Sequence, residues 1–421
     1  MSSKRWKDEI IQLGSMGRKD GKRVEKYEDL DLESGLYRLE GTESARDSKQ
    51  FFIKLMKDAG LEVRIDSVGN IFGRKEGTNP EVKAVMTGSH LDSVLNGGMF
   101  DGVLGVVSAL EAVRIMNDEG FKNERPIEVA VFFGEEGSAF KKGLLGSDVL
   151  LEKISAAEAL KLTNQEGLSL KECLSRDGLC GEFQIDLDNV EYFIEIHIEQ
   201  GPVLDKKKIP IGIVENITGI TWVTIVIEGE ENHAGTTPMM MRCDPLIAAS
   251  EIVLLANRRA KEIVAKQGGS TVATVGKLFT HPGAPNIIPG KVEMGIDIRD
   301  GIVENMTAIR DEIIQALKDM EQKYGVKTSY EIPINHLSCP CSKQVVEALS
   351  EAAKDSGIEA LKMNSGAGHD AQNIAEKVKT AMLFVPSVDG ISHSPMEWTN
   401  WDDIENGIIV LTKALKTLST L

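Results

Sequence analysis

Segments typical of strands alternate with segments typical of helices along the first half of the chain. The apolar run VKAVMTGSH (82–90) precedes the helical pattern GVVSALEAVRIMNDEG (105–120), and IEVAVFFGEEG (127–137) and YFIEIHIEQG (192–201) are further strand candidates. Such alternation indicates βαβ units, in which helices cover a sheet of parallel strands. We therefore predict an α/β fold whose mixed sheet is mostly parallel and carries helices on both faces.

A second pattern of strands and long helices begins near residue 215. GITWVTIVIEGE (219–230), STVATVGKLF (270–279) and GKVEMGIDIRD (290–300) are typical of strands, and 245–267 and 306–325 are typical of helices. This unit of about 115 residues has the size of an inserted domain. We predict that residues 1–214 and 329–421 form one domain and 215–328 a smaller α+β insert, with KTSYEIPI (327–334) marking the return to the first domain.

Composition excludes several classes of function. The chain has 421 residues, 42% of them hydrophobic, which is ordinary for a globular protein with a sizeable core. The net charge of −17 argues against nucleic acid or an anionic membrane as a partner. The first residues have no apolar core typical of a signal peptide, and no run approaches the roughly 18 apolar residues of a membrane span. We therefore expect a cytoplasmic protein with neither partner.

The five cysteines are scattered, and only Cys339 and Cys341 lie close together, as CPC. A structural zinc site normally needs a second pair of ligands, and this pair has no second cysteine cluster. We expect unpaired thiols, as is usual in a reducing compartment.

A glycine-rich stretch, GSHLDSVLNGGMFDGVLGV, places His90, Asp92 and Asp101 between a predicted strand and a predicted helix. It has no GxxxxGK[ST] phosphate loop, and GSHLDS stands where a dinucleotide-binding G-x-G-x-x-G would begin. The chain also lacks the GxSxG elbow of serine hydrolases. Mixed imidazole and carboxylate ligands suit Zn, Mn, Co or Ni.

Other residues of the same types also stand where predicted strands end. In YFIEIHIEQG, strict alternation places the isoleucines on one face and Glu195, His197 and Glu199 on the other. In an open parallel sheet, ligands gather at the carboxyl ends of the strands, so residues far apart in the sequence can converge there. The candidates for such convergence are His90, Asp101, Glu135, Glu136, His197, His233, His369 and His393.

Eight motifs together carry a family resemblance. They are GSHLDSVLNGGMFDG, FFGEEGSAF, EIHIEQGPVL, NHAGTTPM, PNIIPG, DIRD, SGAGHDA and GISHSP. In this order, from Gly88 to Pro395, they resemble the N-carbamoyl-L-amino-acid hydrolases. That family is related to allantoate amidohydrolases and β-ureidopropionases, within the dinuclear aminoacylase and carboxypeptidase-like metallohydrolases.

The resemblance implies two divalent metal ions per subunit, Zn, Mn, Co or Ni. It implies one ion held by His90, Asp101 and His197, and another held by Asp101, Glu136 and His393, with Asp101 as the bridge. Glu135 would be the general base, and the substrate contacts would be Gln200, His233, Asn286, Arg299 and His369. The family is commonly dimeric, so the insert is expected to serve as a lid and dimerisation domain. By its chemistry, His233 could also be catalytic, donating to the developing oxyanion in its own site or the partner's, or it is an ordinary loop residue.

Physical chemistry leaves alternatives for several of these residues. Asp92 is placed to fix the tautomer of His90, or it is an ordinary turn residue. The fork of Arg299 suits a substrate carboxylate, or it forms a surface salt bridge with Asp297 or Asp300. The family often has Arg where this chain has Ala139.

The function implied by the resemblance is hydrolysis of an N-carbamoyl-L-amino acid to the amino acid, CO2 and ammonia. His197, in place of an acidic residue, favours the branch that hydrolyses ureido compounds over the peptidases. Allantoate or ureidopropionate is the alternative substrate, followed by a dipeptide or acylated amino acid. A non-catalytic binding relative would show the loss of Glu135 or of a metal ligand, and all of them are present.

Overall fold

The computed structural model describes residues 4–269 and 271–421, so Ser270 of the predicted strand STVATVGKLF lies outside it. The chain forms two compact units. The larger comprises the residues up to Glu215 with Pro340–Ser365 and His369–Leu421, and the smaller comprises Asn216–Cys339 with Gly366–Gly368. The predicted boundary at residue 328 is wrong. The strand that contains KTSYEIPI, β12 (Lys327–His336), pairs along its length with β7 (Gly219–Glu228) and therefore belongs to the smaller unit.

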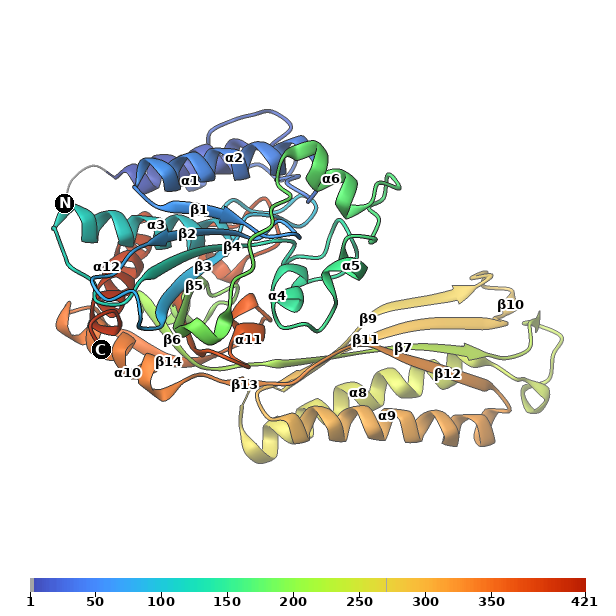
Figure 1. The fold of residues 1–421 in the computed structure, drawn as a ribbon. Coiled ribbons are helices and arrows are strands. Elements are labelled where there is room, and N and C mark those ends of the chain that lie inside the picture. The colour runs from blue at the N-terminus through green and yellow to red at the C-terminus, as the bar shows by residue number, and fades with distance from the viewer. Residues whose placement is uncertain (1–3, 270) are drawn as a thin grey trace. The chain divides into compact units, whose positions relative to one another are not determined.

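Within the described residues, the sheet of the larger unit has nine strands in the order β1-β2-β4-β3-β5-β15-β6-β13, and β14 also pairs with β6 (Figure 1). The strands β4, β3, β5 and β15 run parallel at the centre, and antiparallel pairings flank them. The predicted α/β fold with a mixed sheet is confirmed. The strands are β1 (Glu62–Ile65), β2 (Ile71–Lys75), β3 (Ala84–His90), β4 (Ile127–Phe132), β5 (Val190–Ile198), β6 (Ile211–Ile217), β13 (Cys339–Pro340), β14 (Ala360–Ser365) and β15 (Lys379–Val385).

The central strands β3 and β4 are buried along their whole length, as expected for parallel strands that are covered on both faces. On one face, α3 (Val103–Asp118) and α12 (Trp401–Leu418) pack together, and Gly407 of α12 lies against Ile196 of β5. On the other face, the backbone N–H at the start of α11 (Asp370–Ile374) donates to Glu195. The predicted alternation of β5 is therefore present, with its polar residues turned toward α11.

The remaining helices of the larger unit cover these layers or connect them. Helix α1 packs against α3, α2 against β1 and β2, and α10 against α12 and β15. The elements are α1 (Arg5–Ser15), α2 (Glu43–Asp58), α4 (Leu145–Leu150), α5 (Ala156–Ala159), α6 (Leu170–Asp177), α7 (Val203–Lys207) and α10 (Lys343–Asp355), with the short 3-10 helices η1 (Tyr27–Asp29), η2 (Leu187–Asn189) and η4 (Val388–Gly390).

The smaller unit is an antiparallel sheet in the order β12-β7-β11-β9, with α8 (Pro245–Gln267) and α9 (Val303–Tyr324) packed on one face. Alternate residues of β7 and of β11 (Lys291–Asp300) are buried beneath these helices. The strand β9 (Val272–His281) forms one edge, and β8 (Asn232–His233) pairs with β10 (Ile287–Ile288); η3 (Met239–Met241) precedes α8. The predicted separate α+β unit is confirmed.

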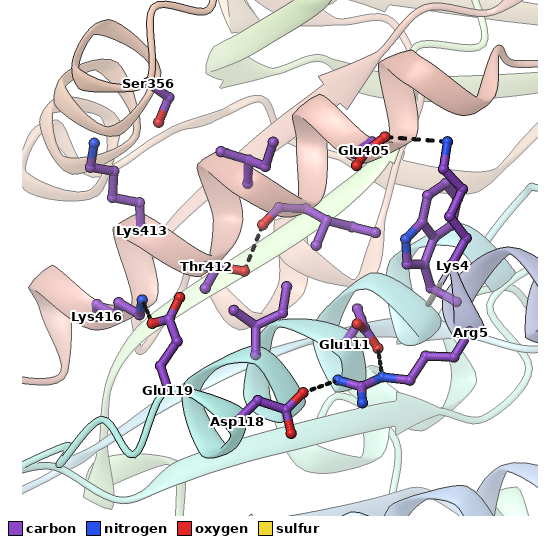
Figure 2. A pocket seen from close by; sticks show the side chains of 14 residues that line it. Lys4, Arg5, Glu111, Asp118, Glu119, Ser356, Glu405, Thr412, Lys413 and Lys416 are labelled. Atoms are coloured by element: carbon purple, nitrogen blue, oxygen red, sulfur yellow. Dashed lines mark hydrogen bonds and ion pairs between the residues drawn. The ribbon is translucent and has the colours of Figure 1, made fainter. Parts of the chain in front are cut away.

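A cavity of about 500 Å³ lies among α1, α3 and α12 (Figure 2). Its lining includes the apolar side chains of Trp6, Ile115 and Ile408. Ion pairs join charged residues of the lining: Lys4 with Glu405, Arg5 with Glu111 and Asp118, and Lys416 with Glu119. These charges pair with one another, and the candidate catalytic residues lie at the strand ends. We therefore do not take this cavity as the candidate functional site.

Cys173, Cys180 and Cys243 are free thiols, as expected. Among the described residues, no helix combines the length and apolar character that a membrane crossing requires.

Close packing of α3 on the sheet generates a stability prediction. A Cβ added at Gly105 would lie 2.5 Å from Cβ of Ser89 and 2.6 Å from the carbonyl oxygen of Ile196. Gly105→Ala should therefore lower the free energy of unfolding by about 1–2 kcal/mol, although Ala favours a helix over Gly by up to about 1 kcal/mol. Urea denaturation measures the change. Gly276→Ala is the control, because a Cβ there meets nothing within 4 Å; equal stability of the two variants would contradict the packing argument.

Candidate functional site

The structure brings the five predicted metal ligands and the predicted base, Glu135, together at the carboxyl ends of the central parallel strands. His90 ends β3, Glu135 and Glu136 follow β4, and His197 lies next to the end of β5. Asp101 lies in the loop between β3 and α3, and His393 in the loop after β15. The strand order β4-β3-β5-β15 makes these ends neighbours, so residues up to 300 positions apart meet at one edge.

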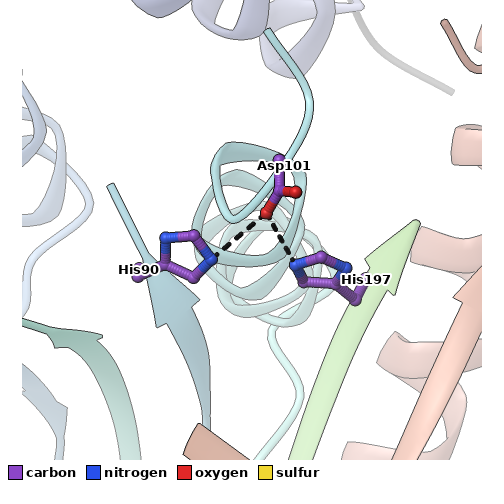
Figure 3. Close-up of side chains that lie close together, drawn as sticks. All are labelled: His90, Asp101 and His197. Carbon is purple, nitrogen blue, oxygen red and sulfur yellow. Dashed lines mark ion pairs between the residues drawn. The ribbon is translucent and has the colours of Figure 1, made fainter. Parts of the chain in front are cut away.

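Asp101 is at the centre of this cluster. Its Oδ1 lies 3.3 Å from Nε2 of His90 and 3.2 Å from Nε2 of His197, as Figure 3 shows. Its Oδ2 lies 3.4 Å from Nε2 of His393 and accepts a hydrogen bond of 2.8 Å from Nε2 of Gln200. Each carboxylate oxygen therefore faces a different set of side chains, which is the arrangement of a bridging ligand.

Two groups of possible metal ligands share Asp101. His90, Asp101 and His197 each offer a ligand atom within 4.8 Å of the others, and so do Asp101, Glu136 and His393. In the second group, Oε2 of Glu136 lies 3.5 Å from Nε2 of His393.

A third group joins His197 with Glu195 and His369. Nδ1 of His197 lies 2.9 Å from the carbonyl oxygen of Ile198, and Nε2 accepts from the backbone N–H of Gly102 at 3.3 Å. With its proton on Nδ1, His197 has a single ring lone pair, on Nε2, which accepts from Gly102 and lies beside Asp101. It therefore cannot serve an ion in the first group and another in the third group at the same time.

Asp92 contacts two parts of the cluster, the His90 ring and the turn that carries Glu135 and Glu136. One of its carboxylate oxygens lies 3.4 Å from Nδ1 of His90, and the carboxylate accepts the backbone N–H groups of Glu135 (3.2 Å) and Glu136 (3.1 Å). The two alternatives for Asp92 are therefore both present in the structure. It orients the His90 ring, whose Nδ1 also lies 3.2 Å from the Asp92 carbonyl oxygen, and it organises the turn after β4.

The charges of the cluster perturb one another strongly. Burial acts to raise the pKa of Asp101, but the nearby imidazoles of His197, His393 and His90 outweigh it and hold the pKa well below its usual range. The hydrogen bond to Asp101 raises the pKa of His393 to about 9. Burial, reinforced by neighbouring carboxylates, raises the pKa of Glu135 and of Glu136 well above their usual range.

This donor set fits divalent cations. Several carboxylates crowd a shielded site, and Oε1 of Glu136 is buried with no hydrogen-bond partner among the described residues. Burial and the neighbouring carboxylates raise the pKa values of Glu135 and Glu136, and positive charge at this point would offset both effects. Imidazole nitrogens together with carboxylate oxygens match the ligands of Zn, Mn, Co and Ni.

Two predicted substrate contacts lie in the larger unit beside the cluster. Gln200 touches both Asp101 and His393. His369 is buried, its ring centroid lies 4.6 Å from that of His197, and neither ring nitrogen has a hydrogen-bond partner among the described residues. Burial lowers the pKa of His369 well below its usual range, so the ring is neutral and has a free donor and a free acceptor.

The other three predicted substrate contacts, His233, Asn286 and Arg299, lie in the smaller unit. His233 ends β8, and the backbone N–H of Ala234 donates to the carbonyl oxygen of Asn286 at 3.0 Å. Nδ1 of His233 accepts the N–H groups of Gly235 and Thr236 at 3.0 and 3.2 Å, so the proton of the neutral ring is on the exposed Nε2. In this tautomer, Nε2 of His233 can donate a hydrogen bond.

Arg299 forms the salt bridge that was the alternative to a substrate contact. Its Nε and Nη2 donate to the two carboxylate oxygens of Asp297 at 2.9 Å each, and Nη1 donates to the carbonyl oxygen of Gly366 at 3.0 Å. Asp300 is not a partner: it is buried and accepts from Thr271, Asn305 and the N–H of Ile302. The ion pair orients the guanidinium.

Sequence reasoning missed three carboxylates that the structure places around the cluster. Glu195, Asp370 and Glu397 are each 0% exposed. Glu195 accepts from the hydroxyl of Ser89 and the backbone N–H of Ala371, and Asp370 accepts from the hydroxyl of Ser147. A signal existed for each, because Glu195 shares a strand face with His197, Asp370 adjoins His369, and Glu397 follows His393 by four residues.

Comparison with known proteins supports an amide-cleaving enzyme. The chain is 39% identical over 388 residues to an N-carbamoyl-L-amino-acid amidohydrolase from Paenarthrobacter aurescens, covering 91% of this chain and 93% of the relative. It is 34% identical over 389 residues to an allantoate amidohydrolase from Bacillus subtilis, covering 92% and 93%. A hydantoinase/carbamoylase family amidase from Burkholderia multivorans superposes with a TM-score of 0.88 at 32% identity, covering 99% and 98% of the two chains.

The model of peptidase family M20/M25/M40 matches residues 86–417, a span that contains every residue of the cluster. Both the sequence relatives and the structural neighbour extend over nearly the whole chain. The chain therefore belongs to peptidase family M20/M25/M40 and is a metal-dependent amide hydrolase.

Proposed function

We propose that the chain is a two-metal amidohydrolase that cleaves the ureido C–N bond of an N-carbamoyl-L-amino acid. The observation that carries this proposal is that Asp101 is shared by two groups of metal ligands beside Glu135. His90, Asp101 and His197 would hold one ion, and Asp101, Glu136 and His393 the other. When bound, two divalent ions of Zn, Mn, Co or Ni would polarise the carbamoyl carbonyl and lower the pKa of water.

Glu135 is the proposed general base. Its Oε2 lies 3.8 Å from Nε2 of His90, and its raised pKa suits a carboxylate that must both accept and release a proton. Glu135 takes a proton from the attacking water and delivers it to the leaving nitrogen of the amino acid. The carbamate released then decomposes to CO2 and ammonia.

The proposed substrate contacts divide the remaining tasks. Nε2–H of His233 would donate to the oxyanion, and Arg299, oriented by Asp297, would bind the substrate carboxylate. Asn286, Gln200 and His369 would bind the rest of the ureido acid. Since the metal ligands belong to one unit and His233 and Arg299 to the other, we propose that the smaller unit is a lid whose closure is required for catalysis.

Allantoate is the alternative substrate, because one relative is an allantoate amidohydrolase and allantoate also presents a carboxylate near a ureido carbonyl. A panel of N-carbamoyl-L-amino acids, allantoate, ureidopropionate and dipeptides tests the proposal through release of ammonia and amine. The highest kcat/KM should fall on an N-carbamoyl-L-amino acid. A preference for allantoate would favour the alternative, and turnover of dipeptides alone would refute ureido hydrolysis. A cytoplasmic location remains a prediction.

Removal of divalent ions should abolish turnover, and one of Mn, Co, Ni or Zn should restore it. The five mixed nitrogen and oxygen ligands motivate this expectation. Elemental analysis alongside the rate measurement checks it. Full activity in a preparation proven to be free of metal would refute a metal mechanism.

Glutamine substitutions should separate the base from the ligand. Glu135→Gln should keep metal content near wild type while lowering kcat by roughly 10²- to 10⁴-fold, because it removes only proton transfer. Glu136→Gln should lose metal as well, because it removes a ligand of the second group. If both variants hold two ions and only Glu136→Gln is inactive, the two roles are exchanged.

We also propose a homodimer in which the smaller unit makes the contact. The strand β9 is a sheet edge, and α8 and β9 expose the apolar side chains of Leu254, Val272 and Phe279. A sheet edge and an apolar helix face suit a two-fold contact. His233 would then act in the partner's site.

Mixing His233→Ala with Glu135→Gln, each inactive alone, tests this arrangement. If His233 acts across the dimer, each hybrid has one site with both lesions and one intact site, and so recovers up to about half the activity of a wild-type dimer. Subunit exchange must be shown independently, for example with tagged chains. Exchange without recovery would place His233 in the site of its own chain.

A further inference from the structure

Glu397 is a fully buried carboxylate whose hydrogen bonds all go to the two loops that carry Asp101 and His393. Its Oε1 accepts the backbone N–H groups of Phe100 (2.9 Å) and Asp101 (3.0 Å), and its Oε2 accepts from the hydroxyl of Ser392 at 2.9 Å. The three donors engage both oxygens of a group that can only accept when it is ionised. None of these contacts involves a side chain to which a role is assigned above.

The position of these donors ties together distant parts of the chain. The two N–H groups belong to the residues that aim the Asp101 side chain, and Ser392 directly precedes His393 in the sequence. The Ser392 hydroxyl also lies 3.3 Å from Oδ2 of Asp101. A single carboxylate thus connects the loop after β3 with the loop after β15.

The loop after β3 is shaped to admit this carboxylate. A Cβ added at Gly98 would lie 2.2 Å from Oε1 of Glu397 and 2.4 Å from its Cβ. The close approach of the Glu397 side chain therefore requires glycine at position 98. A substitution of Gly98 is then a second way to displace the Glu397 side chain without replacing it.

We propose that Glu397 is a positioning residue that holds the loops of Asp101 and His393 in register, so that Asp101, Glu136 and His393 can share the second metal ion. This inference rests on the proposed two-metal function. His90 and His197 do not depend on Glu397 for their orientation, since their Nδ1 atoms contact Asp92 and the carbonyl oxygen of Ile198. Loss of Glu397 should therefore weaken the second ion more than the first.

Burying an ionised carboxylate is unfavourable unless hydrogen-bond donors satisfy its lone pairs. If the role of Glu397 is only to accept these hydrogen bonds, an uncharged acceptor of the same shape should serve as well. Glu397→Gln tests the hydrogen bonds separately from the charge. Its amide oxygen can still accept both backbone N–H groups, while Ser392 can accept from the amide nitrogen and turn its own hydroxyl proton to Asp101. The glutamine variant is thus the conservative rescue of Glu397→Ala.

The experiment is a titration of metal-free full-length protein with Mn or Zn, by calorimetry or chelator competition, for the wild type, Glu397→Ala, Glu397→Gln and Gly98→Ala. Thermal unfolding is followed in parallel. The wild type should bind two ions. Glu397→Ala and Gly98→Ala should bind the second ion about 10- to 100-fold more weakly, whereas the first ion, whose ligands include Asp101 but not His393, should be weakened less. Glu397→Gln should stay close to wild type.

Asp66→Ala is the matched control. Asp66 is also a buried carboxylate that accepts two backbone N–H groups, from Val68 and Asn70 at 2.9 Å, but it lies in the loop between β1 and β2. The Asp66→Ala substitution should lower the unfolding temperature and leave the affinities for both metal ions unchanged. If Glu397→Ala does not fold, the metal affinities of Gly98→Ala and Ser392→Ala are compared with those of the wild type instead.

The outcomes separate the inference from the function on which it rests. A wild-type protein that binds fewer than two ions would overturn the two-metal proposal itself. A wild type with two ions, together with variants that lose thermal stability but keep both affinities, would overturn the positioning role. Selective loss of the second ion, rescued by glutamine, would support it.

Discussion

The carboxylate of Asp101 lies between imidazoles that come from three separate elements, and the architecture of the larger unit makes that position possible. A carboxylate taken out of water is unfavourable unless it meets positive charge or hydrogen-bond donors. Asp101 meets His90, His197 and His393, and also the amide of Gln200. These partners converge because the parallel strands β3, β5 and β15 end at the same edge of one sheet.

Around this centre, backbone groups are held by buried carboxylates. Asp92 organises the turn that carries Glu135 and Glu136, and Glu397 organises the turn that carries Asp101. Such carboxylates are acceptors only, so each can satisfy several N–H groups in a loop that lacks regular structure. Burial, reinforced by neighbouring carboxylates, accounts for the raised pKa values of Glu135 and Glu136 in the turn that Asp92 organises.

The two units divide the chemistry by residue type. In the proposed mechanism, the larger unit would supply the carboxylates and imidazoles that bind metal and move protons, and the smaller unit would supply the donors His233 and Arg299. In the smaller unit, local hydrogen bonds fix the donors in advance: two backbone N–H groups set the tautomer of His233, and Asp297 sets the plane of Arg299. Prior orientation reduces the entropy lost when an anionic substrate binds.

The sequence by itself determined the local patterns: which segments are strands or helices, that His90, Glu135 and Glu136 stand at strand ends, and that Glu195 and His197 share a face. These features follow from periods of 2 and 3.6 residues and from short motifs, which are properties of neighbouring residues. Only the tertiary structure decided which strands pair. In the structure, β12 pairs within the smaller unit, and Asp297 rather than Asp300 is the partner of Arg299. Glu397 lies at the turn of Asp101, which is 296 residues away in the sequence. Pairing between distant segments depends on the packing of the whole sheet, and no local pattern encodes it.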